Sequence, residues 1–346
     1  MLTIRELAKA SGYSPTTISL VLNNSPAGQS IPESTRKKVR SIARKLGYHP
    51  NQFARSLRSS RSQAVAVIIP DISDPYCAQI LCGIDNALYD STCLPMLIDI
   101  QNSRVRYRKY VTTLFERRIE GVIAVANSLQ LQPNMLNSFE KNKIPVVVIG
   151  QVPTSDWICS VRVDNCYGAR CAIEHLYKLG HRRIAFIKGP AKVIDSAHRW
   201  KGILDFSRQT SLHLDQNLIV QLEDAASSSE AGFKAMNKLL RKKQPFTALV
   251  AFDDMTAFGA IRALARAGKR IPEDCSVVGF DDLMAAAYYN PPLTTVSQSM
   301  EDLGRIGIAM LLDRLGAAKD KNEIDLKAIH TELKPLLVVR ASTAAV

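Results

Sequence analysis

Polar side chains that could bind a small molecule follow four apolar runs of the chain. They are Asp71, Ser73 and Asp74 after residues 64–70, Asp195 and Arg199 after 183–189, Asp253 and Asp254 after 247–252, and Asp281 and Asp282 after the run that begins at Ser276. Carboxylates accept hydrogen bonds from hydroxyl groups, and arginine presents a fork of donors, so the set suits a polyhydroxylated ligand. An aspartate in this position can instead cap the next helix, and that alternative stays open for Asp254, Asp281 and Asp282.

The sequence lacks the motifs that are typical of covalent catalysis or metal binding. The sequence contains no GxGxxG, GxxxxGK[ST], GxSxG or HExxH motif, and its seven cysteines form no CxxC pair and have no histidine at metal-ligand spacing. We therefore expect no metal, no cofactor and no enzyme activity, with cysteines that are buried in a reducing compartment. Because a missing motif is weak evidence, an α/β enzyme acting on sugars or nucleotides stays open as a rival.

Short apolar runs alternate with amphipathic segments over most of the chain. The first series is 64–70, 95–100, 121–126 and 144–150, and the second is 183–189, 217–222, 247–252 and 276–281. Continuous apolar runs of this length are typical of buried parallel strands, and their alternation with helices predicts an α/β fold with doubly wound sheets. Two series predict two lobes. Ligands of such sheets bind beyond the carboxyl ends of the strands, which places the polar residues in a cleft between the lobes.

The N-terminal part is far more basic than the rest. Residues 1–62 hold 11 of the 45 Lys and Arg but only two acidic residues, Glu6 and Glu33, so they carry +9 of the net charge of +13. A small basic unit without a long apolar face favours a nucleic-acid partner over a membrane. The N-terminus has no apolar signal region, and no run approaches 18 apolar residues, so we expect a cytoplasmic protein.

Three short helices are predicted in this basic unit. Thr3 and Glu6 form a capping box for the first, and Ser11-Gly12 ends it. Ser14 as N-cap with Pro15 behind it starts the second. The third runs from about residue 33 to Leu46, with an apolar face of Val39, Ile42, Ala43 and Leu46. Helix, short turn and helix is the helix-turn-helix arrangement.

The second helix carries small polar side chains on its outer side. Ile18, Val21 and Leu22 supply its buried stripe, which leaves the outer residues Thr16, Thr17, Ser19 and Leu20. Small hydroxyl side chains approach base edges closely, and threonine methyls pack on thymine methyls, so this side suits the DNA major groove. A plain surface helix whose first turn happens to contain threonine is the open alternative.

Residues 51–62, NQFARSLRSSRS, follow the third helix. Their front half has helical composition, but it is shorter than the roughly 12–15 residues that an isolated helix needs in water. Another molecule must therefore order it.

The head and this segment resemble the lactose-repressor/galactose-repressor family of bacterial transcription regulators. The resemblance is carried by LTIRELAKASGYSPTTISLVLN and TRKKVRSIARKLGYHPNQFARSLRS, and then by HLYKLGHRRIAFIKGP, VAFDDMTAFGAI, IPEDCSVVGFDD and PPLTTVSQSMEDLG in the family's order. It implies an all-α helix-turn-helix DNA-binding head joined to a two-lobed core like that of periplasmic binding proteins.

The resemblance also implies how DNA is contacted. The segment that matches Asn51 to Arg58 is a hinge helix in the family, where Leu57 would wedge between base pairs, Ala54 would form the close helix contact, and Arg55 would neutralise phosphate. The full set of DNA-binding candidates is Thr3, Ser14, Pro15, Thr16, Thr17, Ser19, Leu20, Asn23, Tyr48, Asn51, Ala54, Arg55, Leu57 and Arg58. Leu20 and Pro15 depart from the family, which often has polar base readers there, so the operator is not carried over.

Effector-binding candidates come from the same resemblance. Arg199 in SAHRWKG matches the family's effector-binding arginine, and Asp253 and Asp281 match residues that bind effector hydroxyls or amides. The full set is Asp74, Tyr76, Asp195, Arg199, Trp200, Asp253, Asp281 and Met300, and for Trp200 a place in the core is an equally open alternative. Val193 stands where the purine-binding member has an arginine, which disfavours a purine and leaves a sugar or sugar derivative as the leading effector.

The expected organisation is a head at 1–48, a hinge helix and linker at 49–62, and an effector-binding and dimerisation core at 63–346. The family implies crossings between the lobes near residues 161, 292 and 325, which gives lobe 1 about 63–161 and 293–324, and lobe 2 about 162–292 and 325–346. The sequence ends without a C-terminal leucine heptad, so we expect a homodimer.

The expected function is that of a repressor, which binds a palindromic operator on double-stranded DNA and responds to a small-molecule effector. We expect no membrane partner. A periplasmic-type sugar-binding protein is the second rival, and the basic head argues against it.

Overall fold

The computed structural model describes residues 2–23, 25–48, 62–126, 133–153, 155–223, 227–317 and 327–346. The chain divides into two compact units, Met1–Ser62 and Gln63–Val346, which we call the head and the core.

The head contains the three helices that the sequence predicts. They are α1 (Ile4–Ser11), α2 (Pro15–Leu22) and α3 (Glu33–Lys45), with a short 3-10 turn, η1 (Pro26–Gly28), before the third. The Thr3 side chain accepts from the Glu6 N–H while Glu6 accepts from the Thr3 N–H, so the capping box is formed. Gly12 ends α1 with φ +74°, a backbone conformation that glycine adopts without strain.

One apolar cluster holds the head together. Its fully buried members are Leu7, Ile18, Val21, Val39 and Ala43. Leu46 was expected on this face but is 45% exposed, because α3 ends at Lys45 and the C-cap turns the next side chain off the helical stripe. A cluster this small buries little surface, so the head has a narrow margin of stability.

The core contains two parallel sheets. The first has the order β11-β5-β4-β3-β1-β2 and the second β7-β6-β8-β9. The strands of the first are β1 (Ala64–Ile69), β2 (Leu94–Asp99), β3 (Gly121–Val125), β4 (Val146–Ile149), β5 (Cys159–Val163) and β11 (His330–Leu333). Those of the second are β6 (Ile184–Lys188), β7 (Ile219–Gln221), β8 (Ala248–Ala251) and β9 (Ser276–Val278). All eight strands predicted from the apolar runs are present.

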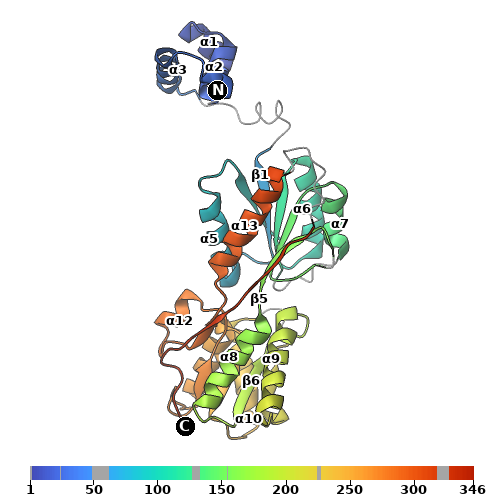
Figure 1. The fold of residues 1–346 in the computed structure, drawn as a ribbon. Helices are drawn as coiled ribbons and strands as arrows, with labels where there is room; N and C mark the ends of the chain where they lie inside the picture. The colour runs from blue at the N-terminus through green and yellow to red at the C-terminus, as the bar shows by residue number, and fades with distance from the viewer. Residues whose placement is uncertain are drawn as a thin grey trace. The chain divides into compact units, whose positions relative to one another are not determined.

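Helices cover both faces of each sheet, as a doubly wound fold requires (Figure 1). On the first sheet, α5 (Pro75–Leu88) and α13 (Met300–Ala317) cover one face, and α6 (Arg104–Glu116) and α7 (Pro133–Lys141) the other. On the second, α8 (Asn165–Lys178) and α9 (Ile194–Thr210) face α10 (Ser229–Arg241) and α11 (Asp254–Arg266) across the strands. A short helix, α12 (Met284–Tyr288), and a 3-10 turn, η2 (Gln216–Leu218), complete the described helices.

Alternation along the strands separates the two faces. In β1, Val65, Val67 and Ile69 pack on the side of α5 and α13, whereas Ala66 and Ile68 pack on the side of α6 and α7. This explains why the strand has a continuous apolar sequence, since both of its faces are buried.

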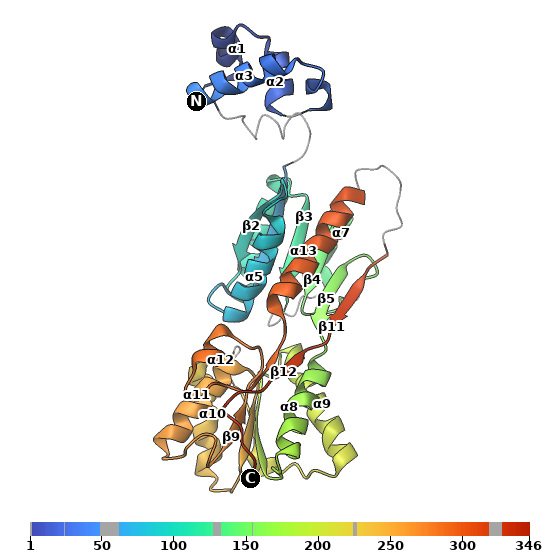
Figure 2. The ribbon, with the colours of Figure 1, turned by 60° about the vertical axis from the view of Figure 1, so that its left-hand side comes forward.

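The chain passes between the lobes three times, and two passages lie later than expected. Residues 294–297 still pair beside β9, through the bridges Val278–Thr294 and Asp281–Ser297, so the second passage falls between Ser297 and Met300 rather than near 292. Strand β11 pairs with β5 in the first sheet, so the third passage follows Leu333 rather than residue 325. β10 (Thr295–Ser297) and β12 (Leu336–Val338, labelled in Figure 2) form a separate antiparallel pair.

Candidate functional site

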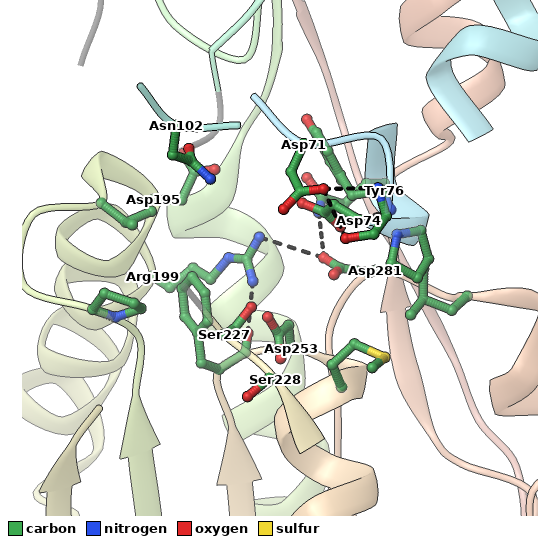
Figure 3. A pocket seen from close by; sticks show the side chains of 18 residues that line it. Asp71, Asp74, Tyr76, Asn102, Asp195, Arg199, Ser227, Ser228, Asp253 and Asp281 are labelled. Atoms are coloured by element: carbon green, nitrogen blue, oxygen red, sulfur yellow. Dashed lines mark hydrogen bonds and ion pairs between the residues drawn. The ribbon is translucent and has the colours of Figure 1, made fainter. Parts of the chain in front are cut away.

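A cavity of about 250 Å³ lies between the two lobes of the core. The first lobe contributes residues from the β1–α5 loop and from the loop before α6, and the second contributes the starts of α9 and α11 and the loop after β9 (Figure 3). Its lining residues are Asp71, Ser73, Asp74, Pro75, Tyr76, Asn102, Pro190, Val193, Asp195, Arg199, Ser227, Ser228, Phe252, Asp253, Met255, Asp281, Leu283 and Gln298. The cavity therefore lies at the carboxyl ends of strands of both sheets, where the fold predicts a ligand.

Arg199 is held rigidly at the centre of this pocket. Its Nε donates to Asn165 Oδ1 at 2.8 Å, and its Nη1 donates to the Phe252 carbonyl at 2.6 Å. The guanidinium also stacks on Phe280, with its Cζ 3.6 Å from the ring centroid. A planar donor fork with a fixed orientation is suited to recognise hydrogen-bond acceptors of a ligand.

Asp281 faces Arg199 across the pocket. Its Oδ1 lies 3.6 Å from Arg199 Nη2 and accepts from Gln298 Nε2 at 2.5 Å. Burial raises the pKa of Asp281 well above its ordinary value, and Arg199 opposes this rise. Its φ of +122° lies in a region that non-glycine residues rarely adopt, and such strain is concentrated at functional sites.

Asp195 and Tyr76 are two further buried polar groups of the pocket. Asp195 is 6% exposed and its Oδ1 accepts from Asn165 Nδ2 at 3.1 Å, so Asn165 links it to Arg199. Burial raises the pKa of Asp195. Burial also raises the pKa of Tyr76 well above its ordinary value, and the nearby negative charges of Asp195 and Asp281 add to this rise.

Three further aspartates cap local structure with one oxygen while lining the pocket. Asp74 accepts from the Tyr76 N–H at 3.0 Å as N-cap of α5, and Asp253 accepts from the Thr256 N–H at 2.7 Å as N-cap of α11. Asp71 accepts from the N–H and hydroxyl of Ser73. Capping therefore orients these carboxylates at the pocket and does not exclude a role in binding.

Asp254 and Asp282 have structural roles instead. Asp254 is fully buried, and its two oxygens accept from the Thr295 hydroxyl at 2.5 Å and the Leu283 N–H at 2.8 Å. Burial raises the pKa of Asp254 to about 7. Asp282 pairs with Arg340 at 2.7 Å. Neither lines the cavity.

Six of the eight effector candidates lie in the pocket, and two do not. Trp200 packs edge-on against Phe186 with ring centroids 5.6 Å apart, because it follows Arg199 on α9 and so points to a different side of the helix. Met300 is 2% exposed and belongs to the apolar core at the start of α13. Neither side chain lines this cavity: Trp200 is half-buried and packs against the apolar cluster of the second lobe, which agrees with the core alternative, whereas the expected role of Met300 as a cavity wall is corrected.

The pocket also contains residues that the sequence did not single out. Asn102, Phe252 and Gln298 line it from three different loops. Phe252 ends the apolar run 247–252 directly before Asp253, and this position was an available signal. Asn102 follows the apolar run 95–100 by two residues, so the same signal was available for it, whereas Gln298 follows none of the predicted strands.

The head presents the candidate DNA-contacting residues around the start of α2. Ser14 caps the helix by accepting from the Thr17 N–H at 3.1 Å, and Pro15 occupies its first turn. Thr16 is exposed, whereas Thr17, Ser19 and Leu20 are half-buried. Leu20 is absent from the apolar cluster of the described head residues. Because the side chains at the accessible start of α2 are small, the helix backbone can approach the base edges of a DNA major groove closely.

The remaining head candidates differ in their surroundings. Asn23 donates to Ser19 Oγ at 3.1 Å, Thr3 caps α1, and Tyr48 packs on the edge of the apolar cluster. The candidates Asn51, Ala54, Arg55, Leu57 and Arg58 lie outside the described residues.

Within the described ranges, no helix has the length and apolar character needed to cross a bilayer. Among the same residues, no group of three or more His, Cys, Asp or Glu side chains is placed to hold a metal ion.

Comparison with known proteins gives matches over both units. Residues 3–51 match the family model described as bacterial regulatory proteins, lacI family, and residues 173–343 match a periplasmic binding protein-like domain. The transcriptional repressor PurR of Proteus mirabilis is 32% identical over 346 residues, which covers 99% of this chain and 97% of that protein.

Solved structures agree with these matches. The lac repressor dimer bound to operator and the anti-inducer ONPF is 25% identical with a TM-score of 0.85, covering 99% of each chain. The transcriptional regulator CelR in complex with cellobiose is 26% identical with a TM-score of 0.73, covering 99% of this chain and all of that one.

Proposed function

Because the chain belongs to the lacI family of bacterial regulatory proteins, we propose that it is a transcriptional repressor that binds operator DNA as a homodimer and acts in the cytoplasm. A small molecule held between the lobes of the core controls this binding. The observation that carries the proposal is the presence, in one chain, of a basic helix-turn-helix head and a two-lobed core with a polar cavity between its lobes.

The head reads DNA through the start of α2. Thr16, Ser19 and Leu20 approach base edges in the major groove, while Ser14 and the first N–H groups of the helix contact phosphate. The +9 charge of residues 1–62 supplies the sequence-independent attraction to the phosphate backbone. Leu57, with Arg55 and Arg58, contributes to operator binding in the minor groove, as the family resemblance implies.

Dimerisation uses one side of the core, which we call the β2 face. The edge strand β2 exposes Leu94 by 60% and Leu97 by 42%, and the neighbouring helix α5 is followed by Tyr89, which is 87% exposed. In both ribbon views α12, with exposed Met284 and Tyr288, lies on the same side of the core as α5 (Figures 1 and 2). An exposed apolar edge strand requires a partner, and a second copy of the chain supplies the same apolar surface.

Sedimentation velocity tests this face. Replacing Leu97 with lysine should shift the protein from dimer toward monomer, because a charge would be buried without a partner. Replacing Val105 with lysine is the matched control, since Val105 is 78% exposed on α6, on the opposite face of the sheet. A dimer that survives the Leu97→Lys change unaltered would exclude the β2 face.

The effector changes the arrangement of the two lobes. Arg199 and Asp281 belong to the second lobe, while Asp74 and Tyr76 belong to the first, so a ligand that contacts all four stabilises one lobe arrangement over others. The operator-binding equilibrium can shift only by the ligand's differential affinity for the two states. Carboxylates and a guanidinium around a cavity of this size suit a sugar or sugar derivative.

The function is tested by selection from a randomised duplex pool with the full-length protein. We expect enrichment of a roughly palindromic site, and a steep fall in affinity for that site as salt increases, because phosphate contacts release counterions. An unenriched pool would overturn the proposal. Thermal shift against sugars, nucleosides and sugar phosphates then identifies the effector class, since a ligand of the folded state raises the melting temperature.

A further inference from the structure

The helix that reads DNA in the proposed function, α2, has no side chain for a bidentate contact with a base. Its sequence is PTTISLVL, without arginine, lysine, asparagine, glutamine or an acidic residue. Guanine is usually recognised by two hydrogen bonds from arginine or lysine, adenine by two from asparagine or glutamine, and cytosine by a carboxylate. None of these pairings is open to α2 itself.

Two of the three hydroxyl groups of α2 are already engaged within the head. The Thr17 hydroxyl lies 2.9 Å from that of Ser14, which also accepts from the Thr17 N–H as the N-cap. Ser19 Oγ accepts from Asn23 Nδ2 at 3.1 Å. Asn23 Oδ1 is buried and has no hydrogen-bond partner among the described residues, so this amide does not present a donor and an acceptor together to a base.

Thr16 and Leu20 form the outward side of the helix. They are four residues apart and therefore lie on one face, opposite the side that packs into the head through Ile18 and Val21. Thr16 is exposed, and half-buried Leu20 lies outside the apolar cluster of the described head residues. The side of α2 that faces away from the head core is therefore largely apolar.

The backbone at Leu20 is fixed by the turn that follows α2. The Leu20 carbonyl accepts from the Ser25 N–H at 3.2 Å. A Cβ atom added at Gly28 in η1 would lie 2.5 Å from the same carbonyl oxygen, so only glycine permits this close approach. Because its backbone is held by two contacts, the Leu20 side chain starts from a defined position, as discrimination between bases requires.

We propose that α2 reads DNA by apolar contact with the C5-methyl groups of thymines, through the Leu20 side chain and the methyl group of Thr16. This inference rests on the proposed function and names the chemical feature of the operator that the helix recognises. The C5-methyl group is the apolar feature that a base pair presents in the major groove. Thymine is therefore preferred at the positions that these two side chains contact, and 5-methylcytosine is preferred there over cytosine.

The basic residues of the head contribute to a different quantity. The 11 Lys and Arg of residues 1–62 attract the phosphate backbone whatever the base sequence, and this attraction sets the salt dependence of binding. A methyl contact releases no counterions. Removing one should therefore lower operator affinity without changing the slope of log affinity against log salt.

Deoxyuridine tests the contact, because it differs from thymidine only in lacking the C5-methyl group. The selected operator is synthesised with deoxyuridine in place of each half-site thymine in turn, and the full-length protein is titrated with each duplex. At one or more positions, binding should weaken about fourfold for each methyl group removed, which corresponds to the burial of one CH₂ group. With cytosine at the same position, 5-methylation should strengthen binding by a similar factor.

Two variants assign the contact to a side chain. Leu20→Ala removes most of the apolar surface, and Thr16→Ser removes one methyl group and keeps the hydroxyl. The deoxyuridine effect should disappear in the variant whose side chain contacts that methyl group, since the two partners of one contact are not additive. Leu46→Ala, which truncates a 45% exposed leucine beyond the end of α3, is the control and should keep the full effect.

Three results would overturn the inference: a selected half-site without thymine, binding that is indifferent to deoxyuridine at every half-site thymine, or a deoxyuridine effect that Leu20→Ala and Thr16→Ser both retain in full. Each of these leaves the repressor standing, because the pool has been enriched. If the pool is not enriched, the proposed function itself fails.

Discussion

Gln298 donates its Nε2 hydrogen bond to Asp281 Oδ1, the same oxygen that faces Arg199 in the pocket. Gln298 lies in the segment that passes from β10 back to the first lobe, and the Asp281 N–H also donates to the Val296 carbonyl of that segment. The passage between the lobes is therefore attached to a carboxylate that a ligand would contact. This is a physical route by which pocket occupancy changes the arrangement of the lobes.

Replacing Gln298 with leucine should weaken the coupling between effector and operator. Asp281 keeps its ion pair with Arg199 but loses its bond to the connecting segment, so the ligand-dependent change in operator affinity should fall by about fivefold or more. Operator titrations with and without the ligand that most stabilises the protein measure this ratio. Gln244→Leu, at an exposed position between α10 and β8, is the control. An equal ratio in both variants would show that Gln298 transmits nothing.

Replacing Arg199 with alanine should abolish the effector response. The change also leaves Asp281 and Asp195 buried without their nearest cation, so the core should lose on the order of 3–5 kcal/mol of unfolding free energy unless these groups take up protons. Thermal melts with and without ligand report both effects. Arg305→Ala removes an exposed arginine of α13 and should leave both unchanged. A retained ligand shift in Arg199→Ala would remove this residue from the site.

The sequence predicted the strands whose two faces are both buried. Runs such as residues 64–70 and 144–150 are continuous and apolar because helices cover both sides of their sheet, so the signal needs no knowledge of partners. Strands β5, β10, β11 and β12 were not among those predicted from apolar runs. β11 is the edge strand HTEL, whose partly exposed residues give no apolar run. Its place in the first sheet depends on pairing with β5, and the paired residues His330 and Ser160 are 170 positions apart in the sequence.

The pocket was predictable where a residue type follows a strand end. Asp74, Asp195, Asp253 and Asp281 follow this rule, and Arg199 came from the family resemblance. The sequence left the place of Trp200 open: it adjoins Arg199 on α9 but lies on another side of the helix, where it packs half-buried against Phe186. Asn102 obeys the same rule, since it follows β2, and was overlooked, whereas Gln298 was missed because the strand before it, β10, was not predicted.

Replacing Leu7 with alanine should unfold the head before the core. Among the described head residues, Leu7 is fully buried in a cluster with four other buried residues, and such a truncation costs about 2–5 kcal/mol, a large part of what a unit of this size possesses. Operator binding should be lost while the main calorimetric transition of the core is unchanged. Leu46→Ala, which truncates a 45% exposed leucine of the same unit, should be nearly silent. Full operator affinity in Leu7→Ala would contradict this view of the head.

Replacing Leu57 with alanine should weaken operator binding by a few kcal/mol, because a smaller side chain cannot wedge between base pairs. Binding to nonspecific DNA rests on phosphate contacts and should change little. Titrations against the selected operator and a scrambled duplex measure the two affinities, with Leu46→Ala as the control. An equal loss on both DNAs would count against the wedge.

Asp254 should make the stability of the core depend on pH. Burial raises its pKa to about 7 in the folded protein, whereas an unfolded chain releases the proton near pH 4. Between these values the folded state binds more protons than the unfolded state, so the contribution of Asp254 to the unfolding free energy falls as the pH rises from about 4 to 7. The decrease is on the order of 4 kcal/mol for a shift of this size.

In Asp254→Asn the amide keeps an oxygen for the Leu283 N–H and cannot titrate, so the melting temperature of the variant relative to the wild type should increase across this window. Melts of both proteins at closely spaced pH values, with Asp302→Asn as the exposed-carboxylate control, measure the difference. A constant difference between wild type and Asp254→Asn would mean that this carboxyl group is ionised throughout, and that the Thr295 and Leu283 bonds outweigh its burial.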